Sequence, residues 1–476
     1  MNERLAEDAS KIDRLLDKTR DRALKFLQSL NERPVSVLPP PYEIASLSDR
    51  GIGAERALEV FEQKYEDGIT ASSGSRYFGF VTGGSTPAAI VGDWLVGIFD
   101  QNAFGSEDTA AYIERETIHF LRQLFNLSDV HSGTFVSGAT MSNFVGLAIA
   151  RQWIARQLGI DVSRDGLYAL PAIKILSGSP HSCIFKALSM LGMGKNNLHI
   201  VPCLSEREAI DLEKLKKCLS SHQQPCIVVA NAGTVNTVDF DPLADIAQLK
   251  QEFNFWLHVD AAFGGFAACS PRYSHLVAGL DSADSIAIDA HKWLNVPYDS
   301  AMQFTKHRDL QLEVFQNHAA YLGLPTDNPD FVHLTPENSR RLRALPAWFS
   351  LMAYGAEGYR EIVENNCQLA KFLGKKIELS SEFKLLAPVR LNVVCFTLSG
   401  EETSSDAIAQ FLAVLRDRGK VFLTPTVYRK IPAIRAALSN WRTERKDIEI
   451  VWEALLETRN SVNNGLWING KKGTRS

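Results

Sequence analysis

Short apolar runs alternate with helical stretches between residues 131 and 306. The runs lack strict alternation of polar and apolar positions, which is typical of strands covered on both faces. Strands that alternate with helices predict a mainly parallel sheet in an α/β domain. The predicted strands are Thr134–Val136, Ile173–Leu176, Cys226–Ala230, Trp256–Val259, Ser285–Ile288 and Ala301–Phe304.

Different patterns flank this region. Apolar residues recur at helical spacing among charges over residues 3–31, which predicts an amphipathic helix. This helix either packs on its own domain or forms an arm on a second subunit. From about residue 346 the pattern indicates a smaller α+β unit. Its predicted elements are a helical start, strands near Leu391–Leu398 and Val421–Leu423, and helices near Ala407–Arg416 and Ile448–Leu456.

Composition makes several classes of protein improbable. The formal net charge of −4 gives no field to attract a polyanion, which disfavours nucleic-acid binding. The seven cysteines are odd in number and lack CxxC spacing, so we expect no disulfide scaffold, no metal site and a cytoplasmic location. The N-terminus has no apolar signal-peptide core, and the most apolar long stretch, residues 78–99, is interrupted by Gly, Pro and Asp. We therefore expect no membrane association.

Lys292 lies just past the predicted strand Ser285–Ile288, in the order Asp289, Ala290, His291, Lys292. A lysine in this position is unusual, because removing an ammonium group from water is costly. A Schiff base to a carbonyl cofactor removes that cost. Taken alone, a surface lysine in a loop is the commoner explanation.

Asp260 follows the strand Trp256–Val259 and precedes Lys292 by 292 − 260 = 32 residues, which leaves room for one helix between adjacent strands. Pyridoxal phosphate needs a carboxylate at its pyridine nitrogen to act as an electron sink. Ala261 and Ala262 are small enough to let a flat ring approach. Alone, a helix cap or an ion-pair partner would explain Asp260 equally well.

A strand-to-helix turn at residues 136–143 has the composition of an anion site. Gly138 is expected to permit a tight turn, after which the backbone N–H groups of Ala139, Thr140 and Met141 would face an anion at a helix N-terminus. The turn lacks a P-loop lysine, which disfavours a nucleoside triphosphate. Many strand-to-helix turns share these residues, so the signal is weak by itself.

Two more polar residues follow predicted strands. His181 comes after Ile173–Leu176, where its ring could stack on a cofactor or move a proton. Thr234 comes after Cys226–Ala230 and would lie at the same sheet edge. Ligands of parallel sheets bind beyond the carboxyl ends of the strands, so these residues together predict one pyridoxal-phosphate site.

With these motifs assembled, the chain resembles the group II pyridoxal-phosphate-dependent amino-acid decarboxylases, which include aromatic-L-amino-acid, glutamate and 2,4-diaminobutyrate decarboxylases. The resemblance runs from about Arg76 to Ala454 and is most specific around Trp256–Ala262 and residues 291–293. It implies the aspartate-aminotransferase fold (fold type I) and a homodimer with sites at the interface. We expect an N-terminal dimerisation segment at 1–80, a large cofactor-binding domain at 81–345 and a small domain at 346–476.

The resemblance also implies a role for each site residue. Lys292 forms the Schiff base, Asp260 pairs with the pyridine nitrogen and His181 stacks on the ring. Thr234 lies near the ring hydroxyl, while Ala139 and Thr140 hold the phosphate. The expected catalytic residues are therefore Lys292, His181, Asp260 and Thr234, and the cofactor-binding set is Ala139, Thr140, His181, Thr234, Asp260, Ala262, Asp289, His291 and Lys292.

The chain departs from the aromatic decarboxylases at two informative positions. Asp289 replaces an asparagine, which puts an anion close to the expected phosphate. Phe331 stands where the mobile loop of those enzymes carries a proton-donating tyrosine, and it has no proton to give. In some plant relatives a phenylalanine there accompanies oxidative aldehyde formation, although Tyr321 or His333 could supply the proton instead.

The leading hypothesis is decarboxylation of an L-amino acid to the amine. One rival is oxidative decarboxylation to an aldehyde, prompted by Phe331. Another is a pyridoxal-phosphate-binding protein without turnover, against which the set of Lys292, Asp260 and His181 argues. Aminotransfer and retro-aldol chemistry are lesser alternatives.

Overall fold

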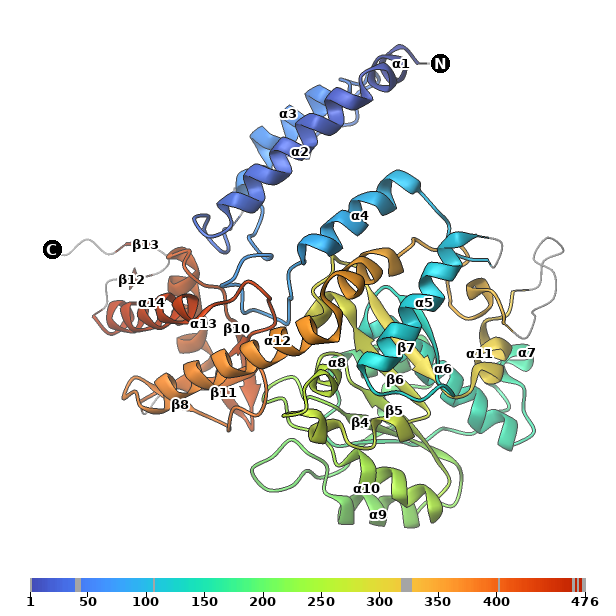
Figure 1. The fold of residues 1–476 in the computed structure, drawn as a ribbon. Coiled ribbons are helices and arrows are strands. Elements are labelled where there is room, and N and C mark those ends of the chain that lie inside the picture. Colours follow the sequence, from blue (N-terminus) through green and yellow to red (C-terminus); the bar gives the residue numbers. More distant parts are fainter. Residues whose placement is uncertain are drawn as a thin grey trace.

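A seven-stranded sheet forms the centre of the computed structural model (Figure 1). The structure describes residues 2–38, 44–105, 108–317, 328–400, 403–464, 467–468 and 471–472. The strand order is β1-β7-β6-β5-β4-β2-β3. The bounds are β1 Ser132–Val136, β2 Ile175–Ser177, β3 Leu198–Ile200, β4 Cys226–Asn231, β5 Phe255–Asp260, β6 Ser285–Asp289 and β7 Ala301–Thr305.

The sheet is mainly parallel, as predicted, with one exception. Strand β7 runs antiparallel to both of its neighbours, β1 and β6. The prediction at Ile173–Leu176 was two residues early, since β2 begins at Ile175. Strand β3 was missed, because it has three residues and two of them are exposed at the sheet edge.

Helices cover both faces of this sheet. Ile227 and Val229 of β4 pack in one apolar cluster with α6, α8 and α11. Val228 and Ala230 pack in the opposite cluster with α5, α9, α10 and the first part of α12. Successive strand residues thus face different helical layers, which explains why these strands are apolar throughout. The helices are α5 Thr109–Leu124, α6 Ala139–Gln157, α7 Val162–Asp165, α8 Ser182–Met190, α9 Leu212–Ser220, α10 Leu243–Gln248, α11 Arg308–Phe315 and α12 Ala344–Glu378.

The C-terminal part contains a four-stranded antiparallel sheet in the order β10-β11-β9-β8. The prediction of a strand at Val421–Leu423 was wrong, since β10 begins at Thr424. Strands β8 and β11 were not predicted. Pro425 in β10 and Pro432 in β11 weaken the strand signal in the sequence. The elements are β8 Phe383–Leu385, β9 Val393–Leu398, α13 Ser405–Asp417, β10 Thr424–Tyr428, β11 Ile431–Ala437, α14 Arg445–Asn463, β12 Trp467–Ile468 and β13 Lys471–Lys472.

Helix α12 joins the two apolar cores. Its residues up to Cys367 pack in the core of the large sheet, and those from Leu369 onward pack in the core of the small sheet. Gly355, with φ of 58°, interrupts the helix. The proposed domain boundary at residue 345 therefore falls in the first turn of a helix that serves both cores.

The N-terminal segment projects from the rest of the chain (Figure 1). The predicted single helix over 3–31 is two helices, because Lys11 leaves helical geometry, and nothing in the local sequence explains that break.

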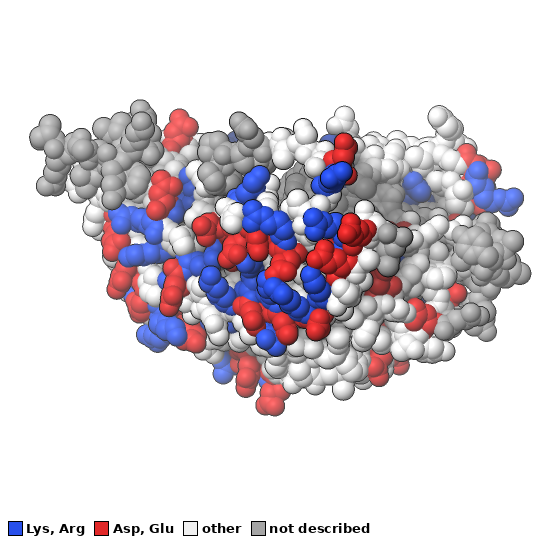
Figure 2. Space-filling model, turned by 90° about the horizontal axis from the view of Figure 1, so that it is seen from above, with Lys and Arg blue, Asp and Glu red and all other residues white. Residues whose placement is uncertain are grey.

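Basic and acidic side chains interleave on the face seen from above (Figure 2). None of the helices in the described part of the chain has the length and apolarity of a membrane span. The helices are α1 Glu3–Ser10, α2 Ile12–Ser29, α3 Ala54–Lys64 and α4 Pro87–Phe99.

Candidate active site

The predicted site residues lie together in a cavity of about 340 Å³. It opens beyond the carboxyl ends of the parallel strands, where ligands of such sheets bind. Strands β4, β5 and β6 end at Asn231, Asp260 and Asp289, and all three residues line the cavity. The nine predicted cofactor-binding residues that line it are Ala139, Thr140, His181, Thr234, Asp260, Ala262, Asp289, His291 and Lys292.

Lys292 lies on a single π-helical turn, Ala290–Leu294, directly after β6. Such turns are rare and occur often at functional sites. Its Nζ is 2.7 Å from Asp289 Oδ2. Burial alone would lower the pKa of Lys292, but the charge and hydrogen bond of Asp289, together with the charge of Asp260, more than offset burial and raise the pKa above its usual value. The amine is thus held protonated by its neighbour.

Asp289 also occupies part of the predicted phosphate cradle. The backbone N–H of Ala139, at the start of α6, donates to Asp289 Oδ1 at 2.6 Å. His291 Nε2 lies 3.6 Å from the same oxygen. The negative charge near the phosphate position is therefore balanced by a lysine and a helix N-terminus.

One detail of the predicted cradle was wrong. Gly138 has φ of 175° and ψ of 171°, an extended conformation that any residue adopts, so it is not needed for a tight turn. A Cβ at this position would lie 3.5 Å from the ring of His291, an ordinary contact.

Replacing Asp289 with asparagine tests its effect on Lys292. We expect the pKa of Lys292 to fall, since burial would then be opposed by one charge fewer. Only the neutral amine attacks an aldehyde, so the rate of cofactor attachment should rise with pH at a lower pH than in the unmodified protein. Stopped-flow absorbance of cofactor-free protein mixed with pyridoxal phosphate measures this. An identical pH dependence in the two proteins would contradict it.

Asp260 ends β5 and is almost fully buried. Its Oδ1 accepts the backbone N–H of Ala262 at 3.2 Å, and its Oδ2 accepts Asn143 Nδ2 at 3.2 Å. The thiol of Cys183 lies 3.8 Å from Oδ2. The carboxylate is thus fixed on one side by donors and open to the cavity on the other.

His181 caps the N-terminus of α8. Its Nδ1 accepts the backbone N–H of Cys183 at 3.3 Å, which leaves Nε2 without a hydrogen bond to the described residues. The side chain is exposed at the cavity wall. It is therefore placed to meet a ligand with its ring face or with Nε2.

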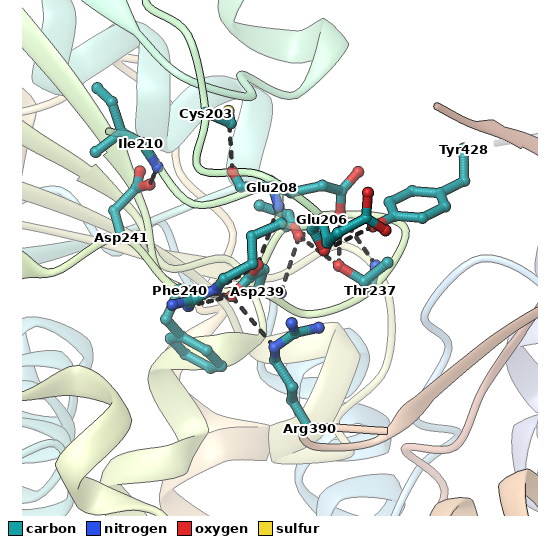
Figure 3. A network of polar contacts seen from close by, with 12 residues as sticks. Cys203, Glu206, Glu208, Ile210, Thr237, Asp239, Phe240, Asp241, Arg390 and Tyr428 are labelled. Atoms are coloured by element: carbon teal, nitrogen blue, oxygen red, sulfur yellow. Dashed lines mark hydrogen bonds and ion pairs between the residues drawn. The ribbon is translucent and has the colours of Figure 1, made fainter. Parts of the chain in front are cut away.

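Thr234 differs in detail from expectation. Its hydroxyl donates to Glu208 Oε2 at 2.6 Å and accepts the backbone N–H of Asp239 at 2.9 Å. Glu208 also accepts a hydrogen bond from the hydroxyl of Thr237 at 2.7 Å (Figure 3). Thr234 lines the cavity, but its polar atom is committed to holding its own loop.

A second acidic residue fastens this loop to the C-terminal part. Asp239 is fully buried and pairs with Arg207 at 2.7 Å and with Arg390 at 3.3 Å (Figure 3). Burial opposes its charge, yet the two arginines keep the pKa of Asp239 below its usual value. The loop that carries Thr234 is therefore anchored from both sides.

The sequence analysis did not assign Arg435 to the site, although this residue forms part of the cavity wall. Arg435 on β11 lines it and donates to the backbone oxygens of Val235 and Phe80. Burial lowers the pKa of Arg435 to about 10. Because β11 was not recognised as a strand, nothing in the sequence brought Arg435 to this position, although Arg435 lies within the range of the resemblance.

Phe331 and the two residues considered as proton donors in its place, His333 and Tyr321, lie away from the cavity or outside the described chain. Phe331 is buried, with the guanidinium groups of Arg115 and Arg340 5.1 and 4.8 Å from its ring centre. His333 is buried, and its Nδ1 accepts the backbone N–H of Asn317 at 3.2 Å. Neither lines the cavity. Tyr321 lies outside the described residues.

The residues of the cavity fit pyridoxal phosphate. Lys292 offers an amine for the aldehyde, Asp260 a carboxylate for the pyridine nitrogen, and α6 an N-terminus for the phosphate. The described residues contain no cluster of His, Cys, Asp and Glu suited to a metal ion. Fold and site together define a fold type I pyridoxal-phosphate enzyme.

Comparison with known proteins narrows this class. The model of the family described as "Pyridoxal-dependent decarboxylase conserved domain" matches residues 46–399, so the chain belongs to that family. It is a pyridoxal-phosphate-dependent amino-acid decarboxylase, a carboxy-lyase.

Similar proteins cover almost the whole chain. An aromatic-L-amino-acid decarboxylase of Bacillus atrophaeus is 26% identical over 94% of this chain and 95% of its own length. A 4-hydroxyphenylacetaldehyde synthase of Rhodiola rosea is 24% identical over 93% and 94%. The crystal structure of Catharanthus roseus tryptophan decarboxylase in complex with L-tryptophan has a TM-score of 0.84 at 21% identity, covering 95% of this chain and 99% of that one.

Proposed function

We propose that this chain converts an aromatic L-amino acid to the corresponding amine, with its cofactor attached to Lys292. The observation that carries the proposal is the convergence of Lys292, Asp260 and His181 on one cavity. Phe80, Val81 and Val235 give that cavity an apolar side, which suits an apolar substrate side chain. The aromatic substrates in the names of similar proteins support the same class.

Each polar residue has a proposed task. Asp289 holds the proton of Lys292 until the cofactor aldehyde arrives, and later keeps the released lysine in place. Asp260 holds a proton at the pyridine nitrogen. His181 presents its ring to the bound cofactor from the cavity wall. When bound, the cofactor accepts the electron pair that remains as carbon dioxide leaves.

A second product has a specific observation in its favour. Phe331 provides no acid, and one similar protein is an aldehyde synthase. Oxidative turnover would consume oxygen and yield aldehyde, ammonia and hydrogen peroxide. Incubating the cofactor-loaded protein with a panel of amino acids, while measuring carbon dioxide, amine and peroxide together, separates the two reactions.

We expect carbon dioxide and amine in equal amounts, without peroxide, and fastest with an aromatic amino acid. Peroxide in equal amount with carbon dioxide would replace the amine by the aldehyde as product. Carbon dioxide released faster from glutamate than from every aromatic amino acid would contradict the proposed substrate class. No carbon dioxide from any substrate would contradict the function.

We further propose a homodimer in which the N-terminal segment packs on the partner subunit, with the sites at the interface. Helix α4 is apolar except for Asp93, yet Val91, Trp94 and Ile98 are about half exposed. Helices α1, α2 and α3 have no buried residue in the single chain. Helices whose apolar side chains are left exposed in this way are typical of subunit interfaces.

Light scattering after size exclusion tests this arrangement. We expect a mass near twice 52.8 kDa. Replacing Leu16 and Leu24 with glutamate should lower it toward the single-chain mass, because both are about half exposed on α2. The control Gln28→Glu adds a charge to the same helix and should leave the mass unchanged. A single-chain mass for the unmodified protein would contradict the proposal.

Two finer assignments complete this proposal. The cysteines in the described chain are unpaired, which supports a reducing cytoplasm as the location. The three-part division at residues 80 and 345 remains our proposed domain organisation.

A further inference from the structure

A buried chain of hydrogen bonds runs from Trp256 to Asp260. Trp256 Nε1 lies 2.9 Å from Ser285 Oγ, which lies 2.7 Å from His258 Nδ1. His258 Nε2 lies 2.8 Å from Asn143 Oδ1, and Asn143 Nδ2 lies 3.2 Å from Asp260 Oδ2. All five side chains are buried, and only Asp260 lines the cavity. This series of hydrogen bonds, carried by residues of β5, β6 and α6, thus connects the buried interior to the one member that lines the cavity, Asp260.

The residues at its two ends fix the direction in which every hydrogen bond of this series is donated. The indole N–H of Trp256 can only donate, so Ser285 Oγ accepts from it and donates its own proton to His258 Nδ1. The Asp260 carboxylate accepts, so Asn143 must turn its amide nitrogen toward it and its oxygen toward His258. His258 Nε2 then carries the proton. Every donor in the chain therefore points toward Asp260.

This direction requires a neutral His258 protonated at Nε2. Burial lowers the pKa of His258 to about 4, partly offset by the charge of Asp260. The ring is therefore neutral near pH 7. A proton on Nδ1 instead would leave the bare Nε2 facing the Asn143 oxygen, with two acceptors 2.8 Å apart.

Gly146 on α6 leaves the space for this ring. A Cβ at Gly146 would lie 2.7 Å from His258 Cε1 and 2.8 Å from Nδ1, which is closer than real contacts allow. The backbone of α6 thus approaches the ring closely on one side. An alanine here would displace His258 without removing any polar group.

We propose that His258 and Asn143 are positioning residues, which hold the Asp260 carboxylate oriented toward the pyridine nitrogen of the cofactor. Ser285 and Trp256 fix the His258 tautomer that this requires. Buried hydrogen bonds in series strengthen one another, and an unpaired member is costly. The inference rests on the proposed function only in giving Asp260 its partner.

Two substitutions at His258 separate positioning from packing. His258→Phe keeps an aromatic ring but leaves the hydroxyl proton of Ser285 and the Oδ1 of Asn143 without their partner. His258→Gln retains an amide donor and acceptor that can bridge the same two residues. We expect His258→Phe to lower kcat about tenfold, with KM within about twofold. The comparison is with metal sites, where residues that hydrogen-bond to the ligands contribute 10- to 100-fold. His258→Gln should restore most of kcat.

Gly146→Ala gives a second variant with all polar groups retained. We expect it to lower kcat as His258→Phe does, and it keeps the test open if His258→Phe fails to fold. A folded His258→Phe or Gly146→Ala protein with the kcat of the unmodified enzyme would overturn the proposal. So would equal losses in His258→Phe and His258→Gln.

The tautomer can be measured without cofactor or substrate. In cofactor-free protein with ¹⁵N-labelled histidine, we expect the His258 signals, assigned by their loss in His258→Gln, to show a protonated Nε2 and a bare Nδ1. A protonated Nδ1 would overturn the directed chain. This result is independent of turnover, whereas absence of carbon dioxide from the unmodified enzyme would overturn the proposed function instead.

Discussion

Replacing Lys292 with alanine is expected to lower carbon dioxide release on the order of a thousandfold or more, which corresponds to about 4 kcal/mol in the barrier. The chain would then lack the amine that attaches the cofactor and that releases the product. Asp289 would lose its ion-pair partner but keep the bond from the backbone N–H of Ala139 at the start of α6. We expect the protein to fold and to bind pyridoxal phosphate without covalent attachment.

The control for this change is Lys195→Ala, at an exposed lysine on the short turn Lys195–Asn197. It should leave both carbon dioxide release and the absorbance of the bound cofactor unchanged. Lys292→Ala should abolish the absorbance band of the attached cofactor. Turnover by Lys292→Ala within tenfold of the unmodified enzyme would contradict the assignment.

Asp260→Asn is expected to lower kcat roughly 100-fold, or about 2.7 kcal/mol. The asparagine has nearly the same shape, but its single oxygen can replace only one of the two carboxylate oxygens, which accept from Asn143 and Ala262 separately. It cannot provide the negative charge that holds a proton on the pyridine nitrogen. The loss should therefore fall on kcat, while KM changes little.

The matched control is Asp241→Asn, a fully buried carboxylate at 2.7 Å from the backbone N–H of Ile210 and outside the cavity. We expect this variant to affect stability and to leave kcat within about threefold. Steady-state rates and thermal melting of both variants measure the difference. If Asp260→Asn kept normal kcat, the pyridine nitrogen would have another partner.

The centre of the large sheet was predictable because β4, β5 and β6 are buried along their whole length and each ends in a polar residue. The lysine, the aspartate and the histidine follow three such strands, so the rule for parallel sheets alone brought them together. The reverse direction of β7 was not predictable from its pattern, since a strand buried on both faces has the same composition in either direction.

Other parts of the site depend on contacts that no local pattern encodes. Arg435 reaches the cavity through a strand that begins beside a proline, and Glu208 holds Thr234 from a separate loop. Asp289 stands where the aromatic decarboxylases have an asparagine, which raised the question of how an anion is tolerated near the phosphate. The structure answers it with the Lys292 ion pair and the Ala139 amide.

Reductive trapping tests the central claim, that Lys292 carries the cofactor, most directly. The protein loaded with pyridoxal phosphate is treated with borohydride, digested and mapped by mass spectrometry. We predict one stoichiometric pyridoxyl phosphate label, on Lys292, and none above background on other lysines. A label on another lysine, or no label in protein that releases carbon dioxide, would contradict the account.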